Sequence, residues 1–138
     1  MNRIIKKALI SVSDKTFLNS ILKILKKYKV SVISSGGTYK YIRKVGYKCT
    51  QISKYTGFDE ILDGRVKTLH PKIHAGILFN RKKISHKNQM NKIKFDPIDL
   101  VIVNLYPFKE TLKKSNSEKK IIENIDVGGP SMVRAAAK

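Results

Sequence analysis

The sequence predicts an α/β domain in which a parallel central sheet is covered by helices on both faces. The first 52 residues alternate apolar runs with amphipathic stretches in the order strand, helix, strand, helix, strand, and the connections are short. A further apolar strand pattern follows at residues 100–105. This alternation is typical of parallel sheets, because each strand needs a crossover before the next can lie parallel to it. A chain of 138 residues, 41% of them apolar, suits one domain with its own core.

The first strand and helix are predicted from residues 7–28. Residues 7–11 are apolar and β-branched, and Ser13 and Asp14 follow, either of which can cap a helix. The helix has lysines on one face and apolar residues at helical spacing on the other. The apolar residues are Phe17, Leu18, Ile21, Leu22, Leu25 and Tyr28.

The second and third strands follow the same pattern. Residues 30–33 predict a second strand, and residues 39–45 predict a helix that ends at Gly46, a natural C-terminal stop. Residues 48–52 predict a weaker third strand.

The rest of the chain is less regular. Residues 53–78 have few periodic runs, so we predict a long functional loop. Residues 85–93 and 117–125 predict helices, and residues 100–105 a buried strand. Pro130 is expected at the first position of a last helix opened by two glycines.

The net charge of +19 would attract polyanions at low salt. The chain has 24 Lys and only 5 Arg, with 18 Ile and 5 Ala. Base readout and bidentate phosphate contacts favour Arg, so this balance indicates coding bias more than specific nucleic-acid recognition. A polyanion-binding basic protein is kept as an alternative function.

The single cysteine, Cys49, cannot form an internal disulfide, which suits a reducing compartment, and we expect a cytoplasmic protein. The apolar run at residues 8–12 is too short for a membrane span, so no membrane association is expected.

The first candidate site is the segment Ser34-Ser35-Gly36-Gly37-Thr38, between a predicted strand and a predicted helix. Two glycines let the backbone approach a ligand, and hydroxyls with helix N-terminal amides can hold a phosphate. Lys15 follows the first strand and is expected at the same edge of the sheet. We favour anion binding over an ordinary turn, although the segment matches neither the Walker loop nor the dinucleotide fingerprint.

The second candidate segment, residues 63–71, places an Asp, an Arg, a Lys, a Thr and a His in one loop. Arg65 can hold a phosphate or carboxylate, and Lys67 can act as an acid or stabilise an oxyanion. His70 and His74 are four residues apart, but Pro71 argues against a regular helix there and no third ligand stands nearby. No metal site is therefore predicted.

Two further segments are candidates for the same edge of the sheet. Asn104 and Tyr106 stand at the end of the predicted strand 100–105 and would point toward the site, although an ordinary strand-end turn is an equally good interpretation. Asp126 and two glycines lead into the last helix.

Together these segments resemble the family of bifunctional enzymes called AICAR transformylase/IMP cyclohydrolase. The order and spacing agree from residue 8 to the last residue, and the run at residues 64–71 is the most specific. The matching segments are residues 11–16, 35–38, 56–58, 63–71, 104–108, 124–130 and 134–138.

The resemblance implies a three-layer fold like that of methylglyoxal synthase and a cyclohydrolase step that needs no metal or organic cofactor. That step closes the purine ring of the formylated ribonucleotide FAICAR to give IMP and water. Residues 1–138 would be the cyclohydrolase domain, incomplete at its C-terminal end and acting as a homodimer. The transformylase domain, which in the family formylates AICAR with 10-formyltetrahydrofolate, would be absent.

The resemblance also implies roles for individual residues. Those matching the family's catalytic groups are Lys67, Tyr106, Asp126 and Lys138. Those matching its substrate-binding side are Ser13, Lys15, Ser35, Gly36, Gly37, Thr38, Arg65, Thr68, Asn104, Val127, Gly128 and Gly129.

Departures from the family pattern are few: Phe17 stands where the family usually has Gly, and Val127 and Val133 are mild apolar changes. The larger departure is length, and exposed apolar surface is expected where the sheet lacks further elements. A nucleotide- or phosphate-binding module like methylglyoxal synthase stays open as a second alternative.

Overall fold

The computed structural model describes residues 4–138, so the first three residues of the predicted domain 1–138 lie outside the described part. Its centre is a four-stranded sheet, parallel throughout, with the strand order β3-β2-β1-β4. The strands are β1 (Lys7–Ser11), β2 (Ser31–Ser34), β3 (Thr50–Gln51) and β4 (Leu100–Val103). The predicted parallel α/β architecture is therefore confirmed.

β1 is an inner strand whose register ties the sheet together. Leu9 pairs with Ile33 of β2 on one side and with Val101 of β4 on the other. Ala8, Leu9 and Ile10 are almost fully buried, as expected of a strand covered on both faces. The loops that follow β1, β2 and β4 consequently leave the sheet at one shared edge, its carboxyl edge.

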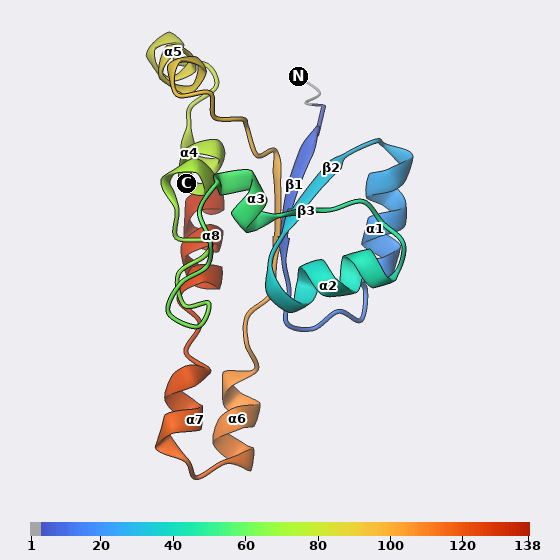
Figure 1. Cartoon of the computed structure of the whole chain (residues 1–138), viewed down its shortest axis with the longest axis vertical. Helices are drawn as coiled ribbons and strands as arrows, with labels where there is room; N and C mark the ends of the chain where they lie inside the picture. The colour runs from blue at the N-terminus through green and yellow to red at the C-terminus, as the bar shows by residue number, and fades with distance from the viewer. Residues whose placement is uncertain (1–3) are drawn as a thin grey trace.

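Helices cover both faces of the sheet (Figure 1). Side chains of α1 and α2 pack with Ala8 and Ile10 on one face, whereas α3, α4 and α8 pack with Leu9 and Ile33 on the other. The alternation of side chains along β1 produces these two separate cores. The helices are α1 (Leu18–Lys27), α2 (Gly36–Lys44), α3 (Ile52–Thr56), α4 (Pro71–Leu78), α5 (Ile84–Lys92), α6 (Phe108–Lys114), α7 (Glu118–Glu123) and α8 (Gly128–Ala137).

Helix α1 begins later than predicted. Its N-cap position is Phe17 and no side chain caps it, so the prediction that Ser13 or Asp14 caps the helix is wrong. Asp14 instead accepts hydrogen bonds from the backbone N–H and the hydroxyl of Thr16, which closes a local turn. Phe17 and Tyr28, at the ends of the predicted apolar stripe, are largely exposed.

The prediction of a long loop at residues 53–78 is also wrong in part, because this segment contains most of α3 and all of α4. Pro71 does not exclude a helix here: it is the first residue of α4, where a missing N–H costs nothing. Pro130 occupies the third position of α8 rather than the predicted first, because the helix already begins at Gly128. β4 ends at Val103, two residues before the predicted end, and its residues are only half-buried because it is an edge strand.

Helices α6 and α7 form a hairpin that projects from the carboxyl edge of the sheet (Figure 1). Neither helix contains a buried residue, and α6 was not predicted. Within residues 104–133 several large apolar side chains are exposed: Leu105, Leu112, Ile122, Ile125, Val127 and Val133. Across residues 4–138, no helix has both the length and the apolar character required to cross a bilayer.

Candidate functional site

A pocket of about 560 Å³ lies at the carboxyl edge of the sheet, and we call it the edge pocket. It is lined by the loops after β1, β2 and β4, by the loop before α4, and by the first residues of α8. Every residue assigned to the site from the sequence lines this pocket, with the exception of Lys138. Segments up to about 115 positions apart in the chain are thus brought to one cavity, as the general rule for open α/β sheets predicts.

The first turn of α2 forms one wall of the edge pocket. The N-cap Ser35 makes no side-chain capping bond, so the first amides of α2 remain available as donors toward the cavity. Thr38 fastens this turn to the loop after β1: its hydroxyl donates to the Val12 carbonyl at 2.9 Å and accepts from the Val12 N–H at 3.1 Å. Ser35 and Thr38 are both buried, which holds the wall in place.

Asn104 joins the loops after β4 and β1. Its side-chain oxygen accepts the backbone N–H groups of Ser13 at 2.6 Å and Asp14 at 3.1 Å, and its amide nitrogen donates to the Asp14 carbonyl at 2.8 Å. Lys15 donates to the Ser13 carbonyl at 2.9 Å within the same loop. Asn104 therefore shapes the pocket wall, because most of its hydrogen-bonding capacity is already used within the protein.

The ammonium of Lys67 lies against two glycines from different loops. A Cβ atom added to Gly36 would lie 3.6 Å from Lys67 Nζ, and one added to Gly64 would lie 3.5 Å from it. Both glycines have positive φ angles, of 52° and 82°, which L-residues rarely adopt. The side chain of Lys67 thereby reaches the first turn of α2, so this cation and the free amides lie on the same side of the edge pocket.

The N-terminus of α8 forms the opposite wall. Asp126 Oδ1 accepts the N–H of Gly129 at 2.8 Å, a capping bond that also holds the carboxylate at the positive end of the helix dipole. Space is tight here: a Cβ on Gly129 would lie 2.5 Å from Asp126 Oδ2, and one on Gly128 would lie 2.5 Å from the Thr68 hydroxyl. Glycine is thus required at both positions for the carboxylate and the hydroxyl to sit beside the helix.

Charges of both signs line the edge pocket. Arg65 forms an ion pair with Glu123 of α7, which links the loop before α4 to the projecting hairpin. The lining carboxylates are Asp63, Glu123 and Asp126, and the lining cations are Lys15, Arg65 and Lys67. The pKa of Asp14, which lies next to the pocket, is lowered. The hydrogen bond from the Thr16 hydroxyl is the largest cause, and the one from the Thr16 N–H is the second.

Lys138 lies away from the edge pocket. It follows α8, whose first residues line the cavity, and ten helical residues separate it from Asp126 and Val127. At the rise of an α-helix this span is about 15 Å. The chain end stands beside α4 in Figure 1, at the other end of α8 from the hairpin. Within one chain the described structure therefore does not bring Lys138 beside Asp126.

His70 and His74 have separate structural settings. Nδ1 of His70 accepts the backbone N–H of Lys72 at 3.1 Å and so caps α4, while Nε2 of His74 is buried without a hydrogen-bond partner. Within residues 4–138 no group of three or more His, Cys, Asp or Glu side chains is arranged to hold a metal ion.

Sequence reasoning missed the contribution of α7 and the segment after it. Ile122, Glu123 and Ile125 line the edge pocket, but the sequence predicted only a helix at residues 117–125 and assigned none of the three to the site. A solvated Glu beside two isoleucines carries no signal of a site, because such patterns are common on amphipathic helices. Their role becomes visible only when the Arg65 pair is located.

Comparisons with known proteins agree with the α/β fold described above. A family model described as "MGS-like domain" matches residues 18–131. The bifunctional purine biosynthesis protein PurH of Acetivibrio thermocellus is 54% identical over 135 residues, covering 97% of this chain and 26% of that protein. PurH of Cutibacterium acnes is 52% identical over 134 residues, with coverage of 97% and 26%. The chain thus spans about a quarter of the length of these curated relatives.

A solved structure has the same fold. The crystal structure of ForH superposes with a TM-score of 0.82 at 31% sequence identity, covering 96% of this chain and 68% of that one. The similarity therefore extends over the sheet, both helical layers and the loops that line the edge pocket.

Proposed function

The chain belongs to the MGS-like domain family, and from that membership, its similarity to PurH and the edge pocket we propose that it is an IMP cyclohydrolase domain. Its reaction is the closure of FAICAR to IMP with loss of water. One observation carries the proposal: fifteen of the sixteen residues assigned to the site from the sequence, all but Lys138, line a single pocket.

The nucleotide phosphate is proposed to bind at the α2 wall. Free amides at the start of α2, the positive end of its dipole and the Lys67 ammonium can all interact with an anion there. Arg65 adds a second cation once it leaves Glu123. Ser13, Lys15 and Asn104 shape the adjoining wall, where the ribose would lie.

The chemical step joins two groups held on one ring. The carboxamide nitrogen attacks the formyl carbon and loses one proton. The formamide N–H supplies a second proton, so that the formyl oxygen leaves as water and a C=N bond remains in the new ring. Asp126, held at the start of α8, is proposed to accept the proton, because a carboxylate is the basic group on that wall. Lys67 and Tyr106 are proposed to donate hydrogen bonds to the oxygen as it gains charge. Holding both groups in reacting geometry lowers the barrier further.

Lys138, the remaining catalytic candidate, would act on the pocket of a second copy or after movement of α8, since its own pocket is about 15 Å away along the helix. We propose a homodimer on this basis and on the exposed apolar side chains at residues 104–133. A cytoplasmic location completes the proposal.

The test is conversion of FAICAR to IMP by the 138-residue chain, followed by ultraviolet absorbance. We expect Lys67→Ala and Asp126→Ala to lower kcat by about 100-fold or more, the usual effect of losing an acid–base or oxyanion group. Lys40→Ala, on the exposed face of α2, is the matched control and should leave turnover unchanged. Near-native turnover in both pocket variants would refute the assignment.

Binding separates this proposal from the two alternatives. IMP should bind tightly and with little dependence on salt, whereas a polyanion-binding protein would prefer a DNA oligomer and show a steep salt slope. A phosphate-binding module without cyclohydrolase activity would bind phosphate and IMP but convert no FAICAR.

A further inference from the structure

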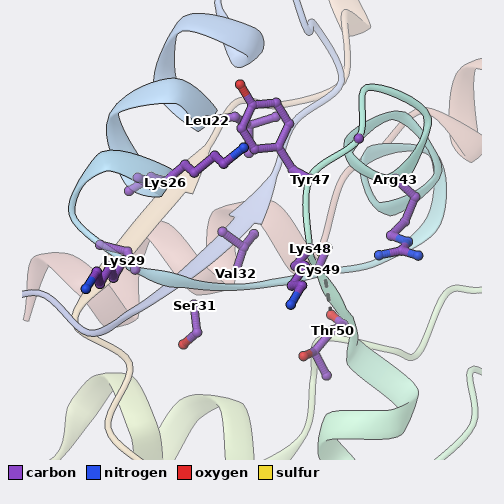
Figure 2. Close-up of a pocket in the computed structure, with 13 residues that line it drawn as sticks. Leu22, Lys26, Lys29, Ser31, Val32, Arg43, Tyr47, Lys48, Cys49 and Thr50 are labelled. Carbon is purple, nitrogen blue, oxygen red and sulfur yellow. Dashed lines mark hydrogen bonds between the residues drawn. The ribbon is translucent and has the colours of Figure 1, made fainter.

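A second pocket, of about 510 Å³, lies between α1, α2 and the two strands β2 and β3 (Figure 2). We call it the basic pocket. It shares no lining residue with the edge pocket. Its wall includes Ser31 and Val32, at the start of β2, whereas the edge pocket begins just after the end of that strand. The two cavities therefore open at opposite edges of the sheet.

Four cationic side chains and no acidic one line the basic pocket: Lys26, Lys29, Arg43 and Lys48. None of them forms an ion pair with a carboxylate within residues 4–138. The sequence explains this, because residues 15–58 contain ten Lys and Arg residues and not one Asp or Glu. Like charges around one cavity repel each other, and a bound anion would remove that repulsion.

The floor of the basic pocket is apolar. Leu22, Leu25 and Val32 are almost fully buried beneath it, and the half-buried Val30, Tyr47 and Cys49 supply the apolar surface that a ligand can reach. Figure 2 shows Val32 and Leu22 in the middle, with Lys29 and Arg43 on opposite sides. The Lys26 ammonium lies 5.7 Å from the centre of the Tyr47 ring, which fixes both side chains at the rim. A ligand that fills this space needs an apolar body as well as negative charge.

We propose that the basic pocket is a second ligand site, which binds a nucleoside polyphosphate. The base and sugar would lie on the apolar floor, and the phosphates would contact the lysine and arginine side chains at the rim. The cavity volume falls in the range of small-molecule sites, roughly 300–1,000 Å³. Four cations match the three to four negative charges of a nucleoside di- or triphosphate, and lysine serves phosphate well as a point charge.

Surplus lysine alone does not account for this arrangement. Lys23 and Lys44 lie on the same two helices but do not line the cavity, so position and not exposure sets the four lining cations apart. A basic surface for nucleic acid would need only the charge, and its affinity would fall steeply with salt. The half-buried apolar lining instead favours a small ligand whose ring covers that surface and removes it from water.

The test measures binding of radiolabelled ATP to the full 138-residue chain by equilibrium dialysis at ~0.15 M salt. The double variant Arg43→Glu with Lys48→Glu reverses two pocket charges. The double variant Lys23→Glu with Lys44→Glu makes the same change in net charge outside the pocket. We expect the pocket pair to weaken binding at least about tenfold and the control pair less than about twofold, because only the former removes contacts to phosphate.

Competition identifies the ligand class. ATP should bind more tightly than inorganic tripolyphosphate and than adenosine, because each of those lacks one half of the proposed contacts. Equal weakening by the two charge pairs would overturn the proposal in favour of general attraction. Equal binding of tripolyphosphate, or of a single-stranded oligonucleotide of the same charge, would overturn it in favour of a polyanion surface.

The rate at which Cys49 is chemically modified gives a second, local measure of ligand binding in the unaltered chain. It lines the basic pocket and is the single thiol of the chain. Bound ATP should slow its modification by methyl methanethiosulfonate, while IMP in the edge pocket should not. Absence of protection at saturating ATP, or competition of ATP with IMP, would place the nucleotide elsewhere and refute the proposal. This proposal stands independently of the cyclohydrolase assignment, because Lys67→Ala should leave ATP protection of Cys49 intact.

Discussion

Arg65 and Glu123, 58 positions apart in the chain, form an ion pair across the mouth of the edge pocket. The pair joins the loop before α4 to the α6–α7 hairpin, which is otherwise built without a buried residue. A nucleotide phosphate that recruits Arg65 must compete with this carboxylate. On the proposed function, the ion pair would therefore oppose ligand binding, while it links the hairpin to the pocket wall.

Replacing Glu123 tests this competition. We expect Glu123→Gln to tighten IMP binding by about two- to fivefold, because Arg65 no longer has to leave a charged partner. Both side chains are well exposed, so the free energy of unfolding should change by less than about 1 kcal/mol. Isothermal titration and chemical denaturation measure the two quantities. Weaker IMP binding would mean that the ion pair organises the pocket for its ligand.

Gly129→Ala should destabilise the fold. The added methyl group would lie 2.5 Å from Asp126 Oδ2 and 2.7 Å from Leu105 Cδ2, so the carboxylate or the helix must shift. We expect a loss of about 1–3 kcal/mol in the free energy of unfolding, as for other overpacked sites. Gly37→Ala is the control, because no atom lies within 4 Å of its added Cβ. Equal stability of the two variants would show that the start of α8 is not tightly packed.

Asn104→Ala should loosen the loop after β1. Its side chain makes three hydrogen bonds to the backbone of Ser13 and Asp14, in a region that water can reach. We therefore expect a modest loss of about 1–2 kcal/mol in stability, together with faster amide exchange at residues 13–15. Asn88→Ala, on the polar helix α5, supplies the comparison. Unchanged exchange at residues 13–15 would contradict the role of Asn104 as a clamp.

The thiol of Cys49 should react slowly at neutral pH. Burial raises its pKa to about 11, although the nearby Arg43 guanidinium partly offsets this. We expect the alkylation rate of the folded chain to rise up to about pH 11, and Arg43→Gln to raise the pKa further and slow the reaction at pH 9. The raised pKa also contributes stability below the ordinary thiol pKa, which is lost between about pH 9 and pH 11. A Cys49→Ala chain should not show this loss of stability between about pH 9 and pH 11. A midpoint of the alkylation rate near pH 9 would contradict the prediction.

Much of the fold was predictable because its strands are short apolar runs with clear boundaries. β1 was predicted at its observed bounds, and Gly46 ends the region of α2 with a positive φ angle of 83°, as a helix-terminating glycine should. The predictions failed where packing overrides local pattern. α4 begins at Pro71, a residue that signals a helix start as readily as a break, and only the burial of Ile73 against the sheet distinguishes the two.

Which residues line the edge pocket was largely predictable, and the contacts between them were not. Residues such as Lys67 and Asp126 stand in segments whose glycines and polar side chains mark them. That Lys67 lies against both Gly36 and Gly64 depends on a tertiary approach between two loops. The same holds for the separation of Lys138 from the pocket, which follows from the straight course of α8 and not from spacing in the sequence.

The strand order also governs how the chain reaches its native state. A short crossover joins β1 to β2. The pairing of β1 with β4 instead joins residues far apart in the chain, such as Ala8 and Leu100. Closing so long a segment costs more entropy than closing the first, so we expect β4 to dock after β1 and β2 have paired. The clamp from Asn104 to Ser13 cannot form before that event. If the proposed function holds, nucleotide affinity at the edge pocket would report that this clamp has formed, because a chain without it lacks one wall of the pocket.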